Sequence, residues 1–471
     1  MRCNMSNESK RKLVAHLMRR AGFGATSAEL DELCNLDYDA LVDSLIDPKD
    51  TSWMGEHMVR RFHHEQSGMM SAYGPGEYWL YRMVTTKAPL IEKMTLFWHA
   101  IFATGYPKVI HGKVLSNQIE MFRRNCMSRL DHLLVQLSKD PAMIIWLDNQ
   151  ENHNGSINEN YGRELLELFS MGVGNYSEDD IKEAARAFTG WTIGNTDYMV
   201  LRSERDSDWP YGRIAWHFEF KEEDHDFGEK EFLGERGNFN GEEIVEIICK
   251  QDATPRFIAR HLYNFFVEDE VPVPSWNDTP PKNPDAIEML VKAYFDNDHS
   301  VKEMVRALLK SEIFKSESIR YKRVKSPAEL VAGVLRLSGH LDRPRREMLE
   351  HFLKMDYMGQ MLQNPPSVEG WHEGDEWIET GALLERVNFA TEQLGNVKMP
   401  GVSRMIDGVL GENVEINDLP ESCLRHLGQL EVTEDVMNIL NEHTSGDVEV
   451  NDQNTSSIIR LIAASPDFQK C

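Results

Sequence analysis

The chain has 471 residues, and 41% of them are apolar, so it can bury more core than one ordinary domain holds. Its 77 acidic residues outnumber its 51 basic ones and give a formal net charge of −26. A surface this acidic repels nucleic acid and anionic membranes, so neither is expected as a partner. The charge indicates high solubility, or else a surface that attracts cations or basic partners.

Membrane and export signals are not visible in the sequence. No apolar run approaches the roughly 20 residues that cross a bilayer. The N-terminus is basic, but His16, Arg19 and Arg20 interrupt the segment that follows it. We therefore expect no signal peptide and a cytoplasmic location. The six cysteines are scattered without a C-x-x-C pair, which argues against a zinc knuckle or a disulfide framework.

Helical periodicity dominates the first third of the chain. Leu13, His16, Leu17 and Arg20 follow i, i+3, i+4, i+7 spacing and predict a helix, which Gly22 and Gly24 end. The segment 78–102 is also helical, but Pro89 inside it predicts two helices rather than one. A further helix is expected over 114–137, and Pro141 fits the first turn of the next.

The segment 195–241 breaks this pattern, because it is rich in acidic, glycine and aromatic residues without helical period. Residues 214–220 alternate in polarity like a strand, and 198–202 could pair with them. Helices resume over 242–250, 255–267, 284–297, 301–311 and 327–338, and the proline-rich segment 271–284 reads as an exposed connector.

These elements predict a mainly α, multi-helical globular protein with one small β-hairpin insertion. We divide it into an N-terminal helical region (1–150), a central region with the polar motifs and the hairpin (151–325), and a C-terminal helical region (326–471).

The helix expected over 158–172 is strongly amphipathic. At 100° per residue, one face gathers the apolar Tyr161, Leu165, Leu166, Leu168 and Phe169, and the other gathers Glu159, Asn160, Arg163, Glu164 and Glu167. We expect Leu165, Leu168 and Phe169 to be buried, together with Trp146 and Phe188. The polar face is either an ordinary solvated surface with i, i+4 ion pairs or part of a polar site.

Two later segments carry similar polar residues. Arg186 lies on an alanine-rich helix that Gly190 and Trp191 end, and the alanines allow another backbone to come close. An arginine in such a helix needs a carboxylate partner. His225, Asp226 and Lys230 lie around a glycine turn and could move protons, or they could simply bond to backbone.

Several motifs together are similar to those of one family, the bacterial "domain of unknown function 1800". They are HLMRRAGFG (16–24), WH (98–99), WLD (146–148), NENYGRELLELF (158–169), TGWT (189–192), HDFGEK (225–230), PPSVEGW (365–371) and SPDF (465–468). They cover nearly the whole chain. The resemblance implies no known reaction. It implies export for many relatives and genes for sulfatase-like proteins nearby, so a sulfatase-like neighbour becomes a possible partner.

Two functions are compatible with these residues. The first is an enzyme acting by hydrolysis or isomerisation on an anionic or sugar-like substrate; no Walker loop or G-x-S-x-G elbow is present. Trp191, Trp371 and Trp377 could stack on sugar rings, although loop tryptophans usually serve packing. The alternative is a non-catalytic binding or assembly protein whose polar network is structural.

The predicted site assembles the polar residues of the three segments. The candidate catalytic residues are Glu164, Glu167, His225 and Asp226. The candidate substrate-binding residues are Asn160, Arg163, Arg186, Trp191 and Lys230. A divalent metal ion held by carboxylates and one imidazole is a further possibility. We expect the three segments to converge on one cleft.

Overall fold

The computed structural model describes residues 7–54, 73–194, 216–341, 345, 347–445 and 449–471. In this part of the chain, 23 α-helices form the body and two small antiparallel sheets of two strands each are attached to it. The mainly α prediction with a small hairpin is therefore confirmed.

The helices of the first half are α1 (Asn7–Arg20), α2 (Ser27–Leu33), α3 (Tyr38–Ile46), α5 (Tyr73–Thr85), α6 (Pro89–Ile101), α7 (Tyr106–Val109), α8 (Gly112–Asn125), α9 (Leu130–Ser138), α10 (Pro141–Trp146), α11 (Asn160–Glu167) and α12 (Glu178–Ala187). Those of the second half are α14 (Gly241–Lys250), α15 (Ala253–Phe266), α16 (Pro284–Asp296), α17 (Val301–Lys310), α18 (Glu312–Lys315), α19 (Pro327–Ser338), α20 (Met348–Tyr357), α21 (Thr380–Leu394), α22 (Pro400–Gly411), α23 (Leu419–His426), α24 (Glu434–His443) and α25 (Asp452–Ala464). The strands are β1 (Trp191–Gly194), β2 (His217–Phe220), β3 (Lys230–Phe232) and β4 (Glu235–Gly237).

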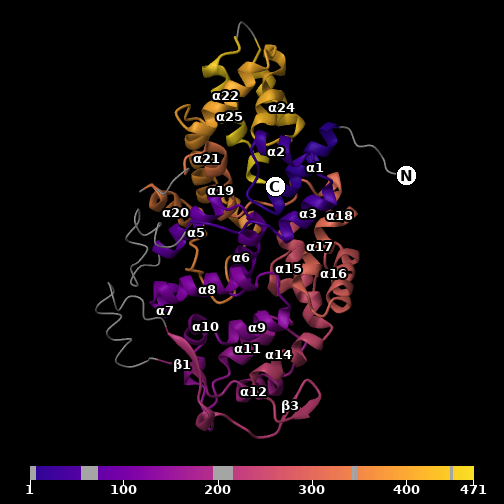
Figure 1. The fold of residues 1–471 in the computed structure, drawn as a ribbon, viewed down its shortest axis with the longest axis vertical. Coiled ribbons are helices and arrows are strands. Elements are labelled where there is room, and N and C mark those ends of the chain that lie inside the picture. Colours follow the sequence, from indigo (N-terminus) through magenta and orange to yellow (C-terminus); the bar gives the residue numbers. More distant parts are fainter. Residues whose placement is uncertain (1–6, 55–72, 195–215, 342–344, 346, 446–448) are drawn as a thin grey trace.

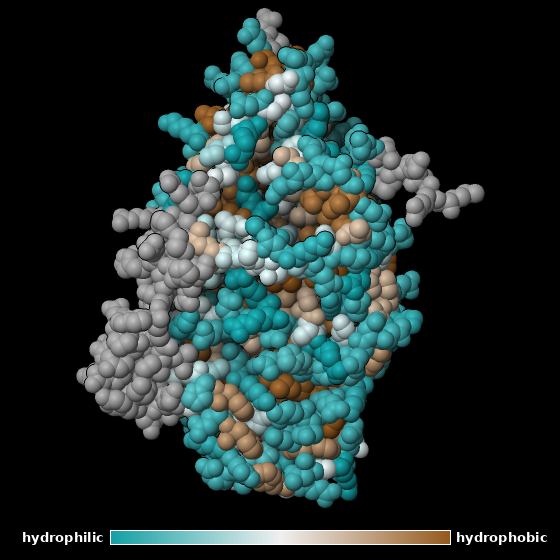
Figure 2. Space-filling view, viewed as in Figure 1, coloured by the Kyte–Doolittle hydropathy of each residue, from teal (hydrophilic) through white to brown (hydrophobic). Residues whose placement is uncertain are grey.

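The molecule is elongated, with the C-terminal helices at one end and the hairpins at the other (Figure 1). The top holds α22, α24 and α25, and the bottom holds α11, α12, β1 and β3. The C-terminal residues pair with a segment far from them in the sequence, because Lys470 forms a β-bridge with Val324. The face in Figure 2 is largely hydrophilic, and none of the described helices has the length and apolar character to span a bilayer.

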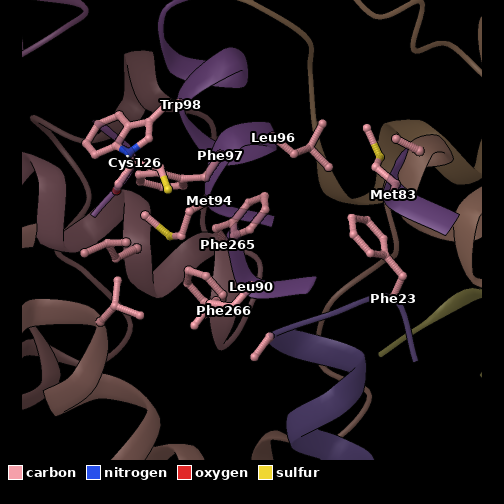
Figure 3. Packing of buried hydrophobic residues seen from close by; sticks show 14 of the residues in the cluster. Phe23, Met83, Leu90, Met94, Leu96, Phe97, Trp98, Cys126, Phe265 and Phe266 are labelled. Carbon is pink, nitrogen blue, oxygen red and sulfur yellow. Dashed lines mark hydrogen bonds between the residues drawn. The ribbon is translucent and has the colours of Figure 1, made fainter. Parts of the chain in front are cut away.

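Helix α6 lies inside the protein, and its burial explains why the segment before Phe102 is rich in apolar residues. Leu90, Met94, Phe97 and Trp98 are all at most 2% exposed. Figure 3 shows this helix among buried residues from distant segments, including Phe265 on α15. The polar residues Glu92, Lys93 and His99 of this helix are buried as well, so the protein encloses it on all sides. The predicted break at Pro89 is confirmed, because α5 ends at Thr85 and Pro89 begins α6.

The hairpin differs from the prediction in its first strand. Strand β2 lies within the expected segment 214–220, but its partner β1 begins directly after the turn at Gly190. The register pairs Trp191 with Phe220 and Gly194 with His217. The expected partner segment, 198–202, lies outside the described residues. The second hairpin, β3 and β4, was not predicted because each strand has only three residues.

The single helix predicted over 114–137 is wrong, since α8 ends at Asn125 and α9 begins at Leu130. Arg129 between them adopts an extended conformation and forms a β-bridge with Ser300. The apolar period continues across the break, so the sequence pattern alone does not show it. A tertiary pairing has overridden the local helical tendency.

The burial prediction holds for Leu165, Phe169 and Phe188, each 0% exposed. It is wrong for Trp146 and Leu168, which are only partly buried. Leu168 follows the last residue of α11 and lines a cleft instead of entering the core.

The α11–α12 contact depends on the absence of a side chain at Gly162. A Cβ atom there would lie 3.0 Å from the carbonyl oxygen of Ile181 and 3.1 Å from the amide nitrogen of Ala185. The prediction that the alanine-rich helix allows close backbone approach is thereby confirmed.

We expect Gly162→Ala to destabilise the protein by about 1–3 kcal/mol, because overpacking forces rigid backbone to shift. Urea denaturation followed by circular dichroism would measure the effect. Gly381→Ala is the matched control: it also lies in a helix, and its Cβ would meet no atom within 4 Å. That substitution is expected to be neutral or stabilising. Equal free energies of unfolding for the two variants would contradict the close approach.

Candidate functional site

A cleft of about 1130 Å³ opens beside α15 and is large for a binding site of a small molecule. Residues of α15 form its floor, and α6 and the end of α11 contribute to its walls. Two loops complete it, one over 269–284 and one over 369–376. The proline-rich segment predicted to be an exposed connector is therefore also a wall of this cleft.

Helix α15 places polar and aromatic side chains in the cleft because of its amphipathic sequence. Phe257, His261 and Asn264 follow i, i+4, i+7 spacing and line the cleft. Ile258 and Leu262, on the other face, are completely buried. The packed face holds the helix rigidly, so the cleft residues have fixed positions.

Glu373 is a carboxyl group in the cleft whose protonation is strongly affected by its surroundings. Its Oε2 accepts a hydrogen bond of 2.9 Å from Nδ2 of Asn264. Burial raises the pKa of Glu373 to about 7. The guanidinium of Arg323 opposes the rise, and the carboxylates of Asp269 and Glu329 add to it. Glu373 can therefore both hold and release a proton near neutral pH.

Asp269 is a second carboxyl group in the same part of the cleft. The loop at Gly374 lies against it, since a Cβ atom there would be 3.6 Å from Cγ of Asp269. Oδ2 of Asp269 accepts a hydrogen bond of 2.8 Å from the amide of Val324, and Oδ1 lies 4.0 Å from Nε of Arg323. Burial raises the pKa of Asp269, although the Arg323 guanidinium and the Val324 amide both favour its ionised form.

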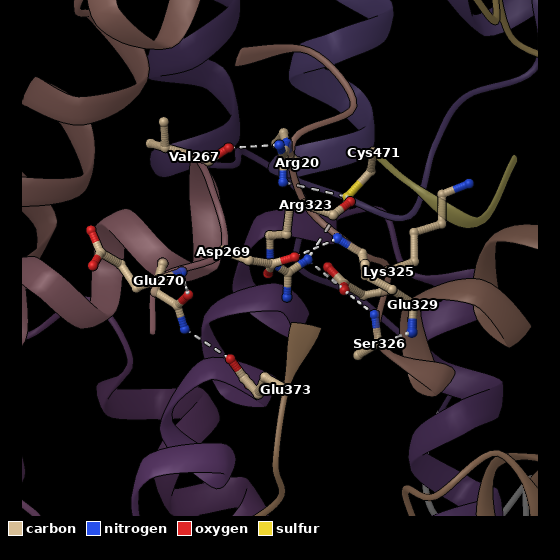
Figure 4. A network of polar contacts seen from close by, with 12 residues as sticks. Arg20, Val267, Asp269, Glu270, Arg323, Lys325, Ser326, Glu329, Glu373 and Cys471 are labelled. Atoms are coloured by element: carbon tan, nitrogen blue, oxygen red, sulfur yellow. Dashed lines mark hydrogen bonds and ion pairs between the residues drawn. The ribbon is translucent and has the colours of Figure 1, made fainter. Parts of the chain in front are cut away.

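A buried network of ion pairs lies next to these two carboxyl groups (Figure 4). Glu329 accepts a hydrogen bond of 2.6 Å from Nη1 of Arg323 and forms an ion pair with Lys93. All three side chains are at most 4% exposed. Burial opposes the ionisation of Glu329, but Arg323 and Lys93 hold its pKa below its usual range. This network fixes Arg323, which in turn lies beside Asp269.

Aromatic rings form part of the cleft wall. Trp276 lies 4.6 Å from the ring of His261 and 5.6 Å from that of Phe257, measured between ring centroids. The guanidinium of Arg260 lies 4.6 Å from the Trp276 ring centroid. Burial lowers the pKa of His261 to about 3, so this imidazole is neutral at physiological pH.

The loop that carries Trp371 is pressed onto α6. Gly370 has φ +88°, and a Cβ atom there would lie 2.5 Å from the carbonyl oxygen of Ala100. Only glycine accommodates both conditions. Trp371 lines the cleft next to the buried ring of His99, 5.2 Å away. The glycine of the PPSVEGW motif thus positions the loop that leads to Glu373.

Of the predicted catalytic residues on α11, Glu167 lies at another part of this cleft, whereas Glu164 is not among its lining residues. Glu167 lines it and accepts a hydrogen bond of 3.0 Å from the hydroxyl of Tyr176. Burial raises the pKa of Glu164 to about 7, and the carboxylates of Glu167 and Glu369 add to the rise. This end of the cleft is therefore strongly acidic.

The other two predicted catalytic residues, His225 and Asp226, belong to a separate ion cluster around α12. Asp226 accepts hydrogen bonds of 2.7 and 3.3 Å from Arg186, whose Nη1 also contacts Glu183. Lys230 donates to the carbonyl oxygen of Asp226 at 2.6 Å. Nδ1 of His225 lies 2.8 Å from the carbonyl oxygen of Thr189.

The remaining predicted residues make local contacts. Arg163 forms a double ion pair with Glu178 at 3.0 and 2.9 Å. Asn160 donates to Asp148 at 3.4 Å. Trp191 is 1% exposed and donates to Asn240 at 2.8 Å. The structure thus joins Arg186, Asp226 and Lys230 in one cluster and Glu164 and Glu167 in another. Convergence of all three segments on a single cleft stays a prediction.

Within the ranges that the structure describes, no group of three or more His, Cys, Asp or Glu side chains is arranged to hold a metal ion. The carboxylate of Asp226 is instead paired with Arg186, and that of Asp269 lies beside Arg323.

The family model "Protein of unknown function (DUF1800)" matches residues 16–470. The chain belongs to this family. No curated protein and no solved structure matches it. The matched range includes all the residues that line the cleft.

The motifs in the sequence do not single out four residues of this cleft and its supporting network: Asn264, Asp269, Arg323 and Glu373. Two signals pointed toward them: the PPSVEGW motif ends two residues before Glu373, and the proline-rich segment begins two residues after Asp269. The sequence predicts loops at both places, and loops that border a rigid helix often carry function.

Proposed function

We propose that this protein is an acid–base enzyme that acts on a neutral, polyhydroxylated, sugar-like substrate in the α15 cleft. One observation supports this most strongly: Glu373, with a pKa raised to about 7, lies in the cleft with Asp269 as a second carboxyl group nearby. Two carboxyl groups in different environments are the arrangement that divides acid and base roles.

The charge of the cleft favours a neutral substrate over an anionic one. Among the described residues, eight carboxylate side chains line it against five lysine or arginine side chains. Three of the basic residues are already paired, Arg256 with Glu288, Arg260 with Glu270, and Lys282 with Glu268. An anion would meet a net negative wall, whereas hydroxyl groups can donate to carboxylates.

The roles follow from the surroundings of each group. In hydrolysis, Glu373 donates its proton to the glycosidic oxygen while the bond from that oxygen to the anomeric carbon breaks. Asp269 accepts a proton from the water molecule whose oxygen forms the new bond to that carbon; Arg323 and the Val324 amide favour its ionised form, although burial raises its pKa. Trp276 and Trp371 provide apolar faces for sugar rings. The volume of the cleft leaves room for an extended substrate.

The test is turnover of neutral oligosaccharides. The purified protein would be incubated with cellopentaose, maltopentaose, laminaripentaose and chitopentaose, and products would be identified by mass spectrometry. Glu373→Gln and Asp269→Asn are expected to lower the rate by about 10²–10⁴-fold, because each removes a proton-transfer group.

Glu379→Gln is the control. Glu379 is exposed, directly precedes the first residue of α21 and does not line the cleft. Its rate should equal that of the unmodified protein. Binding without turnover, unaffected by Glu373→Gln, would instead support the alternative of a non-catalytic binding protein.

A further inference from the structure

Asn264 makes two hydrogen bonds whose directions are fixed by chemistry. Its Oδ1 accepts from the backbone amide of Glu270 at 2.7 Å, and its Nδ2 donates to Oε2 of Glu373 at 2.9 Å. A backbone N–H can only donate, so the amide oxygen of Asn264 must face Glu270. The amide nitrogen then faces Glu373, and the alternative flip is excluded because it would set two donors against each other.

The position of this donor does not depend on Glu373. Asn264 lies on α15, whose opposite face is packed in the core. Glu270 is anchored by Arg260 at 2.8 Å and by the amide of Lys282 at 2.8 Å, and its side chain is 1% exposed. The rigid helix and the anchored loop therefore hold the Asn264 amide in place before any substrate binds.

A fixed N–H donor makes the two oxygens of Glu373 inequivalent. Oε2 faces the N–H group and must act as an acceptor, so in the neutral acid it is the carbonyl oxygen. Among the described residues, Oε1 has no hydrogen-bond partner. A proton placed on Oε2 would collide with the Asn264 donor, whereas one on Oε1 meets no such obstacle.

We infer that Asn264 is a positioning residue that holds Oε2 of Glu373 as an acceptor and so assigns the transferable proton to Oε1. The inference rests on the proposed function for its catalytic meaning, because the positioned proton is the one that Glu373 would donate. Asn264 itself does not exchange protons and is not a catalytic residue.

The experiment observes Glu373 directly and requires no substrate. Infrared difference spectra of the full-length protein would be recorded across pH, and the carboxyl C=O band of Glu373 would be identified by its loss in Glu373→Gln. Two variants change Asn264. Asn264→Leu removes the donor, and Asn264→Asp keeps an acceptor for Glu270 while replacing the donor with a carboxylate.

We expect the C=O band to move to higher wavenumber in Asn264→Leu, because the carbonyl loses its hydrogen bond. In Asn264→Asp, proton binding by Glu373 should tighten by about tenfold or more, one pKa unit, because a like charge replaces the N–H group. Asn277→Asp is the matched control: it adds the same charge to an exposed position of the cleft lining that makes no bond to Glu373, and it should have a smaller effect.

An unchanged band in Asn264→Leu, or equal titration of Glu373 in the two aspartate variants, would overturn the inference. If Asn264→Leu fails to fold, Asn264→Asp decides by its titration, because it retains the contact with Glu270. A protein that turns over no oligosaccharide but shows both responses would overturn the proposed function and support the positioning role.

Discussion

Glu329→Gln is expected to destabilise the protein by about 3–5 kcal/mol, the loss typical of breaking a buried ion pair by removing one partner. The carboxylate of Glu329 is shared by Arg323 and Lys93, and it also accepts a hydrogen bond of 2.7 Å from the amide of Ser326. Glutamine has the same shape but no charge, so two buried cations would lose their counter-ion. Urea denaturation at pH 7 would give the difference in the free energy of unfolding.

The control is Glu392→Gln, which removes the same charge from an exposed position on α21. It should change the free energy of unfolding by less than about 0.5 kcal/mol. Equally small losses in the free energy of unfolding for the two variants would mean that Glu329 is not tightly paired in the network of Figure 4. Loss of stability in Glu329→Gln should also loosen Arg323, and with it the position of Asp269.

The fold could be predicted from sequence wherever local rules decide. Pro89 and Pro141 mark helix starts, Gly339 adopts the left-handed conformation that ends α19, and apolar spacing identifies α15, α17 and α19. The prediction failed where tertiary contacts decide, as at Arg129, whose pairing with Ser300 splits the helix expected over 114–137.

The candidate site was less predictable for the same reason. Asn264 and Glu373 are 109 positions apart, and no spacing rule connects them. The family motifs drew attention to the polar residues of 158–230, where Arg186 and Asp226 do form a close cluster. The charged groups of that cluster are already bonded to one another and to backbone oxygens. The carboxyl groups with raised pKa values in the cleft can be recognised only from burial, which a sequence does not report.

The pH dependence of stability provides a test of Glu373 that is independent of any substrate. A glutamate in an unfolded chain titrates near pH 4.3, and burial raises the pKa of Glu373 to about 7 in the folded protein. The folded state therefore binds this proton more tightly than the unfolded state does. Its contribution to stability is fully present below about pH 4 and is lost as the pH rises to about 7.

Glu373→Gln cannot lose a proton, so its stability should fall less between pH 5 and pH 8 than that of the unmodified protein. One pKa unit corresponds to about 1.4 kcal/mol of stability, and the partial exposure of Glu373 to the cleft weakens this effect. We therefore expect the stability lost up to pH 8 to be about 1–3 kcal/mol smaller in Glu373→Gln than in the unmodified protein. Urea midpoints at the two pH values would measure this difference. Glu379→Gln, which changes an exposed glutamate outside the cleft, is the control. Parallel pH profiles for Glu373→Gln and the unmodified protein would mean that Glu373 is ionised throughout this range. It could then accept a proton but not donate one, and the acid role would have to pass to another carboxyl group of the cleft.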